Sequence, residues 1–164
     1  MDVRLLSNKD IDTILLLQDK AIANKDPFTP SSRELYERAF LFQNFVFGVF
    51  HCDRLIGYCN CSIPTHKAAI NLGRDIIPDA DLDMVGHINT ILIDSNYRRK
   101  GYGEKLLSSV LEYFRTEKTV KYIYTTVQAN NKPSYNLFTK QNFIPLKIFN
   151  NKGKDKYLLQ LTIL

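Results

Sequence analysis

The feature that most constrains this chain is the stretch Arg98–Gly103, which reads Arg-Arg-Lys-Gly-Tyr-Gly. It follows the apolar run Ile88–Ile93, typical of a buried strand, and leads directly into the helix-forming run Glu104–Leu111. The first amides of a helix lack partners within it, and the helix dipole makes that end partly positive. Glycines let a phosphate approach the backbone. The stretch therefore predicts an anion-binding turn between a strand and a helix, and a basic surface loop is the alternative.

Two common phosphate-binding patterns do not fit this turn. The phosphate loop G-x-x-x-x-G-K-[ST] does not occur in the chain. A dinucleotide fingerprint, G-x-G-x-x-G, fails because Leu106 stands where its third glycine should be. The turn does fit the pattern R-x-x-G-x-G, which indicates an anion-binding site but not which anion it binds.

A second motif follows at Asn131–Phe143, which reads NKPSYNLFTKQNF. With the first motif it resembles the GNAT superfamily of acetyl-CoA-dependent N-acetyltransferases, whose signature in this region is N-x-x-A-x-x-L-Y-x-K-x-G-F. Two motifs in the right order are more specific than either alone. The resemblance covers Leu82–Phe143, and outside that range it rests on the order of the predicted elements.

The hydrophobic pattern predicts alternating strands and helices in a single domain over residues 1–164. Alternating or β-branched runs predict strands at Val3–Leu6, Phe45–His51, Leu55–Ile63, Val85–Ile93, Val120–Val127, Ile144–Phe149 and Tyr157–Ile163. Cys52-Asp53-Arg54 joins the second and third of these in a hairpin, in which Cys59 and Cys61 share one buried face. The polar segment Thr65–Met84 predicts a long connection, with a helical turn near Asp79–Met84.

Helical spacing and capping residues predict four helices. They are a first helix over Ile11–Ile22 capped by Asn8 or Asp10, a second from the capping box Ser31-x-x-Glu34 to Phe42, a third from the glycine turn to about Glu117, and a fourth from Pro133. Asn142 stands where the family has glycine, and asparagine tolerates the left-handed conformation that such a position requires. The element order indicates an α/β (α+β) fold. The resemblance implies a mixed, mostly antiparallel central sheet, splayed between strands four and five and flanked by about four helices.

The composition of the chain limits the classes of partner that we expect. The net charge of +5 is mild, and no long Lys/Arg tract or nucleic-acid motif occurs, so we expect no nucleic-acid partner. No segment has the length and apolar character of a membrane span or signal peptide, so we expect no membrane partner and a cytoplasmic location. Cys52, Cys59 and Cys61 are odd in number and lack zinc spacing, so we expect no metal.

The resemblance implies that acetyl-CoA is the acyl donor and co-substrate. In the family, pantetheine pairs with the backbone of the fourth strand, and the pyrophosphate binds to the amides of the turn. Carried onto this chain, the cofactor-binding residues are Ile91, Leu92 and Ile93 on the strand, Arg98, Arg99, Lys100, Gly101, Tyr102, Gly103 and Glu104 in the turn, and Asn131, Ser134 and Phe138 in the second motif. For Asn131, a plain helix cap is the alternative.

Acetyl transfer needs an amine that has lost its proton to a base or to a chain of water. Family members often place a glutamate on the fourth strand for this, and alignment on Arg98 and Gly101 puts His87 at that position. Histidine titrates near the working pH, so the exchange is chemically sensible, and a merely packed histidine is the alternative. The fifth-strand position that carries glutamate in some relatives is Thr126, which cannot act as a base.

The general acid differs from the family pattern. The usual tyrosine, which protonates the leaving thiolate, is replaced by Phe138. Tyr135 lies one turn earlier on the same helical side and is the candidate acid, acting through water. Because a thiol has a pKa of about 8.5, protonation helps departure but is not obligatory.

The acyl acceptor is the least determined part. Asp75, Asp79, Asp81 and Asp83 favour a cationic amine or are simply a solvated acidic loop, whereas Arg74 would grip the carboxylate of an amino acid. We expect a small-molecule primary amine or an amino acid, and a monomer or homodimer. A protein or peptide amine, a non-catalytic acetyl-CoA-binding module and a nucleic-acid-binding protein are the alternatives.

Overall fold

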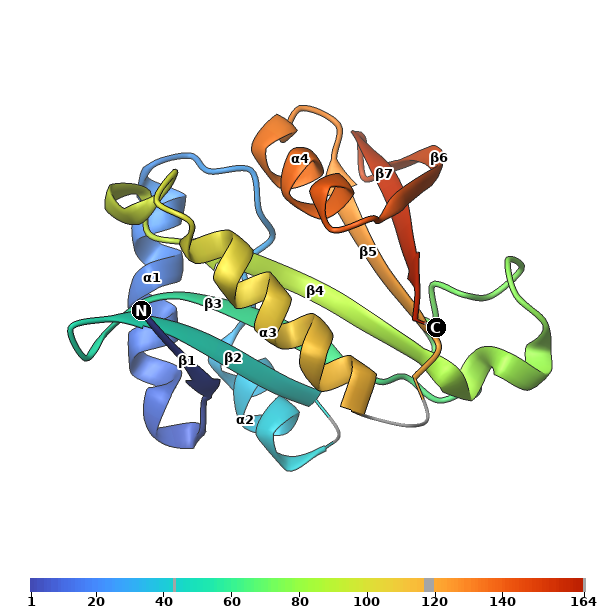
Figure 1. The fold of residues 1–164 in the computed structure, drawn as a ribbon, viewed down its shortest axis with the longest axis horizontal. Coiled ribbons are helices and arrows are strands. Elements are labelled where there is room, and N and C mark those ends of the chain that lie inside the picture. The colour runs from blue at the N-terminus through green and yellow to red at the C-terminus, as the bar shows by residue number, and fades with distance from the viewer. Residues whose placement is uncertain (43, 117–119, 164) are drawn as a thin grey trace. The chain divides into compact units, whose positions relative to one another are not determined.

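A computed structural model describes residues 1–42, 44–116 and 120–163 of the chain (Figure 1). The strands form a sheet in the order β1-β2-β3-β4-β5-β7-β6. Their bounds are Asp2–Leu5 (β1), Asn44–His51 (β2), Arg54–Ser62 (β3), Val85–Ile93 (β4), Tyr122–Gln128 (β5), Ile144–Asn151 (β6) and Lys154–Thr162 (β7). The β4–β5 pair is parallel, and the pairs β1–β2, β5–β7 and β6–β7 are antiparallel. The mixed, mostly antiparallel sheet is thereby confirmed.

The described residues contain four α-helices and three short 3₁₀ helices. The α-helices are Ile11–Ala23 (α1), Arg33–Leu41 (α2), Tyr102–Thr116 (α3) and Lys132–Lys140 (α4), and the 3₁₀ helices are Asn8–Asp10 (η1), Asp79–Met84 (η2) and Ser95–Tyr97 (η3). The helical turn expected at Asp79–Met84 is confirmed. The expected end of the third helix at Glu117 lies outside the described residues. Within those residues, no helix combines the length and apolarity that crossing a membrane requires.

The chain divides into two compact units. The first comprises Met1–Cys61 and Thr90–Leu111, and the second comprises Ser62–Asn89 and Glu112–Leu164. The boundary passes through β4 and α3, so each unit contains part of both elements. The expectation of a single domain over residues 1–164 stays a prediction.

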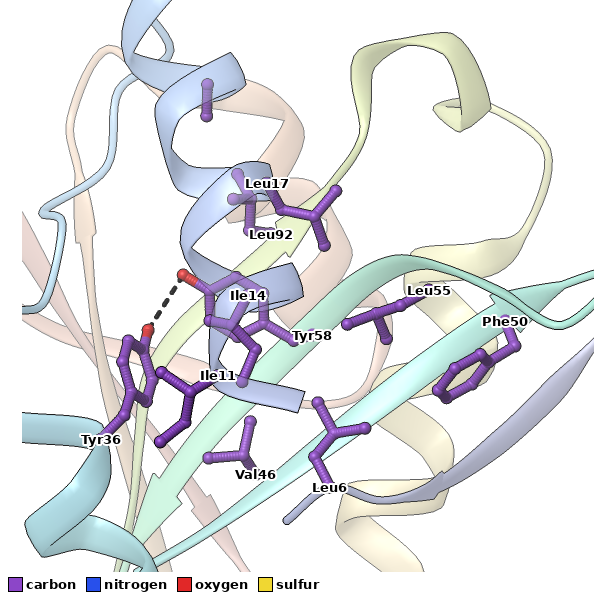
Figure 2. Close-up of a cluster of buried hydrophobic side chains, with 11 residues drawn as sticks. Leu6, Ile11, Ile14, Leu17, Tyr36, Val46, Phe50, Leu55, Tyr58 and Leu92 are labelled. Carbon is purple, nitrogen blue, oxygen red and sulfur yellow. Dashed lines mark hydrogen bonds between the residues drawn. The ribbon is translucent and has the colours of Figure 1, made fainter. Parts of the chain in front are cut away.

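In the first unit, one face of α1 packs on the strands. Ile11, Ile14, Leu17 and Ala21 recur at helical spacing and are all buried, which is the stripe that helical periodicity predicts. Figure 2 shows this cluster, in which the helix meets side chains from the chain start, α2 and the strands: Leu6, Tyr36, Val46, Phe50, Leu55, Tyr58 and Leu92. Full burial of such side chains contributes about 1.5–3 kcal/mol each, so this contact fixes α1 against the sheet.

A polar hub lies inside this apolar cluster, at the carboxamide of Gln18. Its Oε1 accepts a hydrogen bond from the backbone amide of Ser31 (2.9 Å) and lies within hydrogen-bond distance of the hydroxyls of Tyr36 (3.2 Å) and Tyr58 (3.1 Å). Its Nε2 donates to the carbonyl of Ser31 (2.9 Å). The two tyrosine hydroxyls also bond to each other, as the dashed line in Figure 2 shows. Gln18 therefore binds both the amide and the carbonyl of Ser31, which lies in the segment between α1 and α2.

The cap of the second helix differs from the predicted one, whereas that of the first lies at a predicted position. Ser32, not Ser31, caps α2, and its hydroxyl accepts from the amide of Leu35 at 3.3 Å. The backbone of Ser31 is instead bound by the side chain of Gln18. Asp10 is the N-cap residue of α1. Its carboxylate accepts from the amide of Ser7 (2.8 Å), the residue that precedes η1.

In the second unit, the long connection packs on the sheet instead of lying free in solvent. Leu72, Ile76 and Ile77 pack against the buried side chains of Val85, Tyr124 and Leu158. Asn71 fixes this segment, because its side-chain amide donates to the carbonyl of Leu82 (2.8 Å) and its side-chain oxygen accepts from the amide of Gly73 (3.0 Å). Apolar packing and the hydrogen bonds of Asn71 together fix a segment that has no hydrophobic periodicity.

The β4–β5 ladder is short. Its register runs from Val85 opposite Tyr122 to Ile88 opposite Thr125, and both strands continue beyond these pairs. Thr126 is therefore the first residue of β5 past the registered ladder. The splay predicted between these strands is consistent with this register and stays a prediction.

The turns follow their sequence signals. Cys52 and Asp53 join β2 to β3 with φ of 45° and 61°, the left-handed pair that tight hairpins favour. Asn142 has φ of 66°, as expected for the residue in the place of the family glycine. Cys59 and Cys61 are both fully buried, with sulfur atoms 3.6 Å apart, so the prediction of a shared face is confirmed.

We predict that Gln18→Leu lowers the free energy of unfolding by about 1–3 kcal/mol, because it leaves buried donors and acceptors without partners. Urea denaturation followed by circular dichroism measures this change. Leu16→Gln on the same helix is the control, since Leu16 is 67% exposed and the change should cost less than about 0.5 kcal/mol. Equal losses in both variants would contradict a special role for the hub.

Candidate functional site

The turn after β4 has the backbone geometry of an anion site. Arg99 and Gly101 have φ of 60° and 83°, in the left-handed region, and α3 begins at Tyr102. The first helical hydrogen bond runs from the amide of Lys105 to the carbonyl of Gly101 (3.0 Å). The amides of residues 102–104 therefore precede the hydrogen-bonded ladder of the helix, at its partly positive end. This part of the predicted site, from Arg99 to Glu104, forms as one turn.

The side chain of Arg98 is used inside the protein. Its Nε donates to the carbonyl of Ile93 (2.9 Å), and its two terminal nitrogens form a bidentate ion pair with Asp26. The hydrogen bond to Asp26 raises the pKa of Arg98. All three contacts lie in the first unit, and they fix the turn to β4 and to the segment after α1. Arg98 thus shapes the turn, and a direct contact with acetyl-CoA stays a prediction for this residue.

A second ion pair fixes the start of the same turn. The side chain of Asp94 is only 1% exposed and accepts from Nζ of Lys20 (2.6 Å) and from the amide of Asn96 (2.9 Å). Burial opposes ionisation of Asp94, but the hydrogen bonds from Lys20 and Asn96 outweigh it and lower its pKa. Neither partner in this pair was singled out by the sequence, because Lys20 and Asp94 lie 74 positions apart.

An aromatic cluster supports the start of α3. The hydroxyl of Tyr102 lies 2.6 Å from Nδ1 of His51, and the ring of Tyr97 packs against both rings, with centroids 5.3 and 6.0 Å away. Nζ of Lys100 donates to the carbonyl of Asn96 (3.0 Å) and lies over the ring of Tyr97. The buried ring of Tyr102 thus fixes the helix end, while Arg99 and Lys100 are exposed. Sequence analysis missed His51, since no local signal marks it.

The strand residues of the predicted site divide by burial. Leu92 is buried in the core of the first unit, whereas Ile91 and Ile93 are half-buried. The carbonyl of Ile93 accepts from Arg98, so one of its acceptor positions is occupied by the protein. Backbone pairing of these residues with pantetheine stays a prediction.

In the second unit, Asn131 caps α4. Its side-chain oxygen accepts from the amide of Ser134 at 3.2 Å, the contact expected of a helix cap. The plain cap that the sequence left open is therefore present. It uses the side-chain oxygen of Asn131 and the amide of Ser134, and a contact of either residue with the cofactor stays a prediction. Pro133 lies at the second position of the helix, one later than expected.

The candidate acid and its neighbours lie on α4. Tyr135 is half-buried, and its ring packs against the ring of Tyr157, with centroids 4.8 Å apart. Phe138 is 1% exposed and packs edge-on against Phe143, with centroids 5.1 Å apart. Tyr135 is therefore the more exposed of the two side chains, and Phe138 is part of the buried packing.

His87 on β4 is buried, at 4% exposure, and neutral. Its Nε2 accepts a hydrogen bond from the amide of Leu72 (3.0 Å), and burial lowers its pKa to about 4. The neutral ring therefore carries its proton on Nδ1, and its one lone pair is already occupied. These contacts favour the packed histidine that the sequence left as the alternative, and the role of base stays a prediction.

Several charged side chains of the long connection have partners within the protein. One nitrogen of Arg74 donates to the carbonyls of His66 and Ala68, both at 3.1 Å. Asp83 accepts from the amide and ring of His66, and Asp81 faces Lys121 and Tyr122. Among the described residues, no three His, Cys, Asp or Glu side chains gather as a metal site would require. Most charges that the sequence proposed for acceptor binding therefore have structural partners.

Known proteins resemble this chain over the region of both motifs. The sequence model of the acetyltransferase (GNAT) family matches residues 15–143. An N-alpha-acetyltransferase of Sulfolobus acidocaldarius is 25% identical over 162 residues, which cover 96% of this chain and 89% of the relative. An N-alpha-acetyltransferase of Saccharolobus solfataricus is 31% identical over 77 residues, 45% of this chain, and this match spans just under half (46%) of the relative's length.

Solved structures share the fold. The ribosomal-protein-S18-alanine N-acetyltransferase of Escherichia coli superposes with a TM-score of 0.77 at 15% identity, covering 99% of this chain and 93% of that one. Arabidopsis thaliana NAA60 in complex with acetyl-CoA gives 0.77 at 17% identity, covering 99% and 98%. At such identities the likeness shows the fold alone.

Two glycines offer a matched test of the turn. Gly101 and Gly153 both have positive φ (83° and 77°), and a Cβ added at either would meet no atom within 4 Å. We predict that acetyl-CoA raises the melting temperature of the wild type and of Gly153→Glu but not of Gly101→Glu, because only the latter puts a carboxylate into the anion site. Differential scanning fluorimetry measures the shifts. If acetyl-CoA still raises the melting temperature of Gly101→Glu, the anion site does not lie at this turn.

The buried histidine predicts a pH dependence of stability. His87 has a folded pKa of about 4, below the ordinary 6.5, so the unfolded state binds more protons between these values. Its contribution is complete above pH 6.5 and is lost as the pH falls toward 4, at most about 3 kcal/mol. Urea denaturation from pH 7 to 4 should show a shallower loss in His87→Gln than in the wild type.

The same variant tests the role of base. Glutamine can still accept from the amide of Leu72, so we expect His87→Gln to keep most activity at pH 7.5. A loss of 10²-fold or more with an unchanged melting temperature would instead assign proton removal to His87.

Proposed function

Because the chain belongs to the GNAT family of acetyltransferases, we propose that it transfers the acetyl group of acetyl-CoA to the α-amine of a protein or peptide. The observation that carries the acceptor class is the likeness to the Sulfolobus acidocaldarius N-alpha-acetyltransferase over 96% of the chain. The partial match to the Saccharolobus relative, which bears the same name, supports it. This acceptor replaces the small amine or free amino acid as the favoured substrate.

The chemistry requires an activated acyl group and an unprotonated amine. Acetyl-CoA supplies a thioester, whose carbonyl carbon the amine nitrogen attacks. A C–N bond forms, the C–S bond breaks, and the amine loses one proton while the coenzyme thiolate gains one. The amides at the start of α3 and the exposed side chains of Arg99 and Lys100 support binding of the pyrophosphate.

The proton of the amine has two routes. His87 is the base that the sequence proposed, but its lone pair accepts from Leu72 and its pKa is about 4. A peptide α-amine has an ordinary pKa of about 7.7–8.0, so a large share is already neutral near that pH. We favour loss of the proton to water, which such a substrate permits and an alkyl amine with a pKa of about 10 does not.

The acceptor class is tested with a matched panel. With acetyl-CoA held saturating, release of free coenzyme thiol is followed for peptides with free N-termini, the same peptides with a blocked N-terminus, free amino acids and small alkyl amines. We expect turnover with the free peptides alone. Turnover only with amino acids or alkyl amines would overturn the peptide assignment, and thermal stabilisation by acetyl-CoA without any turnover would indicate a binding module.

Tyr135 is our candidate for protonating the thiolate. Tyr135→Phe retains the ring that packs on Tyr157 and removes only the hydroxyl. We expect kcat to fall about 10- to 100-fold with little change in melting temperature, as for loss of a general acid. Tyr157→Phe, the other ring of the pair, is the control and should retain kcat. An equal fall of kcat in both variants would indicate that the two tyrosines act through their packing and not through an acid at Tyr135.

A further inference from the structure

Strand register in the second unit gathers three lysines on one face of the sheet. Thr126 of β5 lies opposite Leu158 of β7, which lies opposite Lys147 of β6. In the next row, Lys156 of β7 lies between Gln128 and Phe149, and in the third row Lys154 lies opposite Asn151. Directly opposed residues of antiparallel strands point to the same face, and so do alternate residues along β7. Lys147, Lys154 and Lys156 therefore form one surface, the lysine face.

These lysines have no charged partner among the described residues. Lys147 and Lys154 are exposed, Lys156 is half-buried, and no ion pair or hydrogen bond of the described structure involves their ammonium groups. The carboxylate of the hairpin, Asp155, points to the opposite face and accepts from Asn150 (2.9 Å). Three like charges within neighbouring rows repel one another, so an anionic partner is favoured there.

The lysine face begins beside the place where the β4–β5 ladder ends. Thr126 is the first residue of β5 past the registered pairs, and Lys147 shares its row. Successive rows on one face are two residues apart, about 7 Å. An extended peptide rises about 3.3 Å per residue, so a chain leaving the Thr126 row reaches all three lysines within about two to four residues.

The other end of this face has no excess of positive charge. The connection that packs at Tyr124 and Leu158 contains Lys67 and Arg74 but also four aspartates, at positions 75, 79, 81 and 83. The positive charge that an acceptor meets on the face therefore comes from the lysines. This field repels polycationic amines and attracts carboxylates placed a few residues from the reacting nitrogen.

We propose that the lysine face selects acceptor peptides with acidic side chains at the second to fourth positions. The inference rests on the proposed acetylation of peptide α-amines and names the class of peptide. A nucleic acid would also bind lysines, but the two side chains that share the face's middle row, Gln128 and Phe149, offer one half-buried ring and no further cation. The distance from the Thr126 row to the three lysines, which an extended peptide spans in about two to four residues, favours a peptide over a nucleic acid.

The test compares peptides that share one N-terminal residue and carry Glu, Gln or Lys at positions two to four. With saturating acetyl-CoA, thiol release gives kcat/KM for each peptide. We expect Glu peptides to exceed Gln peptides by about tenfold at low salt, the factor that two or three exposed ion pairs supply. The ratio should shrink at 0.5 M NaCl, where such pairs are screened.

Charge variants test whether the lysine face causes the preference for Glu peptides. Replacing all three lysines by glutamine should bring the Glu/Gln ratio to about one with an unchanged KM for acetyl-CoA, and replacing them by arginine should keep it. Lys154→Glu with Lys156→Glu should reverse the preference toward Lys peptides, a gain that misfolding cannot produce. Lys9→Glu, an exposed change in the first unit, is the control and should keep the wild-type ratio.

The outcomes separate this inference from the proposed function. Peptide turnover with equal kcat/KM for Glu and Gln would overturn the inference alone. Turnover of free amino acids or alkyl amines without peptides would overturn both. Salt-sensitive binding to a generic RNA that vanishes in the triple glutamine variant, without a peptide preference, would assign the face to nucleic acid and overturn the inference.

Discussion

The anion-binding turn depends on charges that reach it from α1 and the segment after it. Lys20 neutralises the buried carboxylate of Asp94 at the start of the turn, and Asp26 holds the guanidinium of Arg98 at its middle. The side chain of Asp94 is only 1% exposed, and a buried charge that loses its partner costs several kcal/mol, so the pair with Lys20 fixes the start of the turn. The left-handed residues Arg99 and Gly101 and the start of α3 follow immediately after Arg98.

Local signals predicted most of the fold and the place of the candidate site. The strand–turn–helix sequence around Gly101, the stripe of α1, the turn Asp79–Met84 and the left-handed Asn142 all appear where the pattern indicated them. Each of these depends on residues close in sequence, where periodicity, capping and glycine chemistry act directly. The last strand was predicted too short because Lys154 and Lys156 have low strand propensity, and pairing with β6 and β5 overrides it.

What the sequence could not predict depends on contacts between distant residues. Arg98 and Asp26 lie 72 positions apart, and His51 and Tyr102 lie 51 apart. Ser32 and not Ser31 caps α2, and the backbone of Ser31 is bound by Gln18, thirteen residues earlier. Likewise, the ring of His87 accepts from the amide of Leu72, fifteen residues earlier in a segment without periodicity. Such contacts decide which side chains of a motif remain available for chemistry.

The contacts of Arg98 within the protein affect the thermodynamics of acetyl-CoA binding at the anion-binding turn. Its three contacts order the turn within the protein, so the entropy cost of that ordering falls on folding and not on association. Binding of a polyanion to such a turn should resemble docking onto a rigid surface. The heat-capacity change should then reflect only the apolar area that the ligand covers, without the added signature of a loop that folds as it binds.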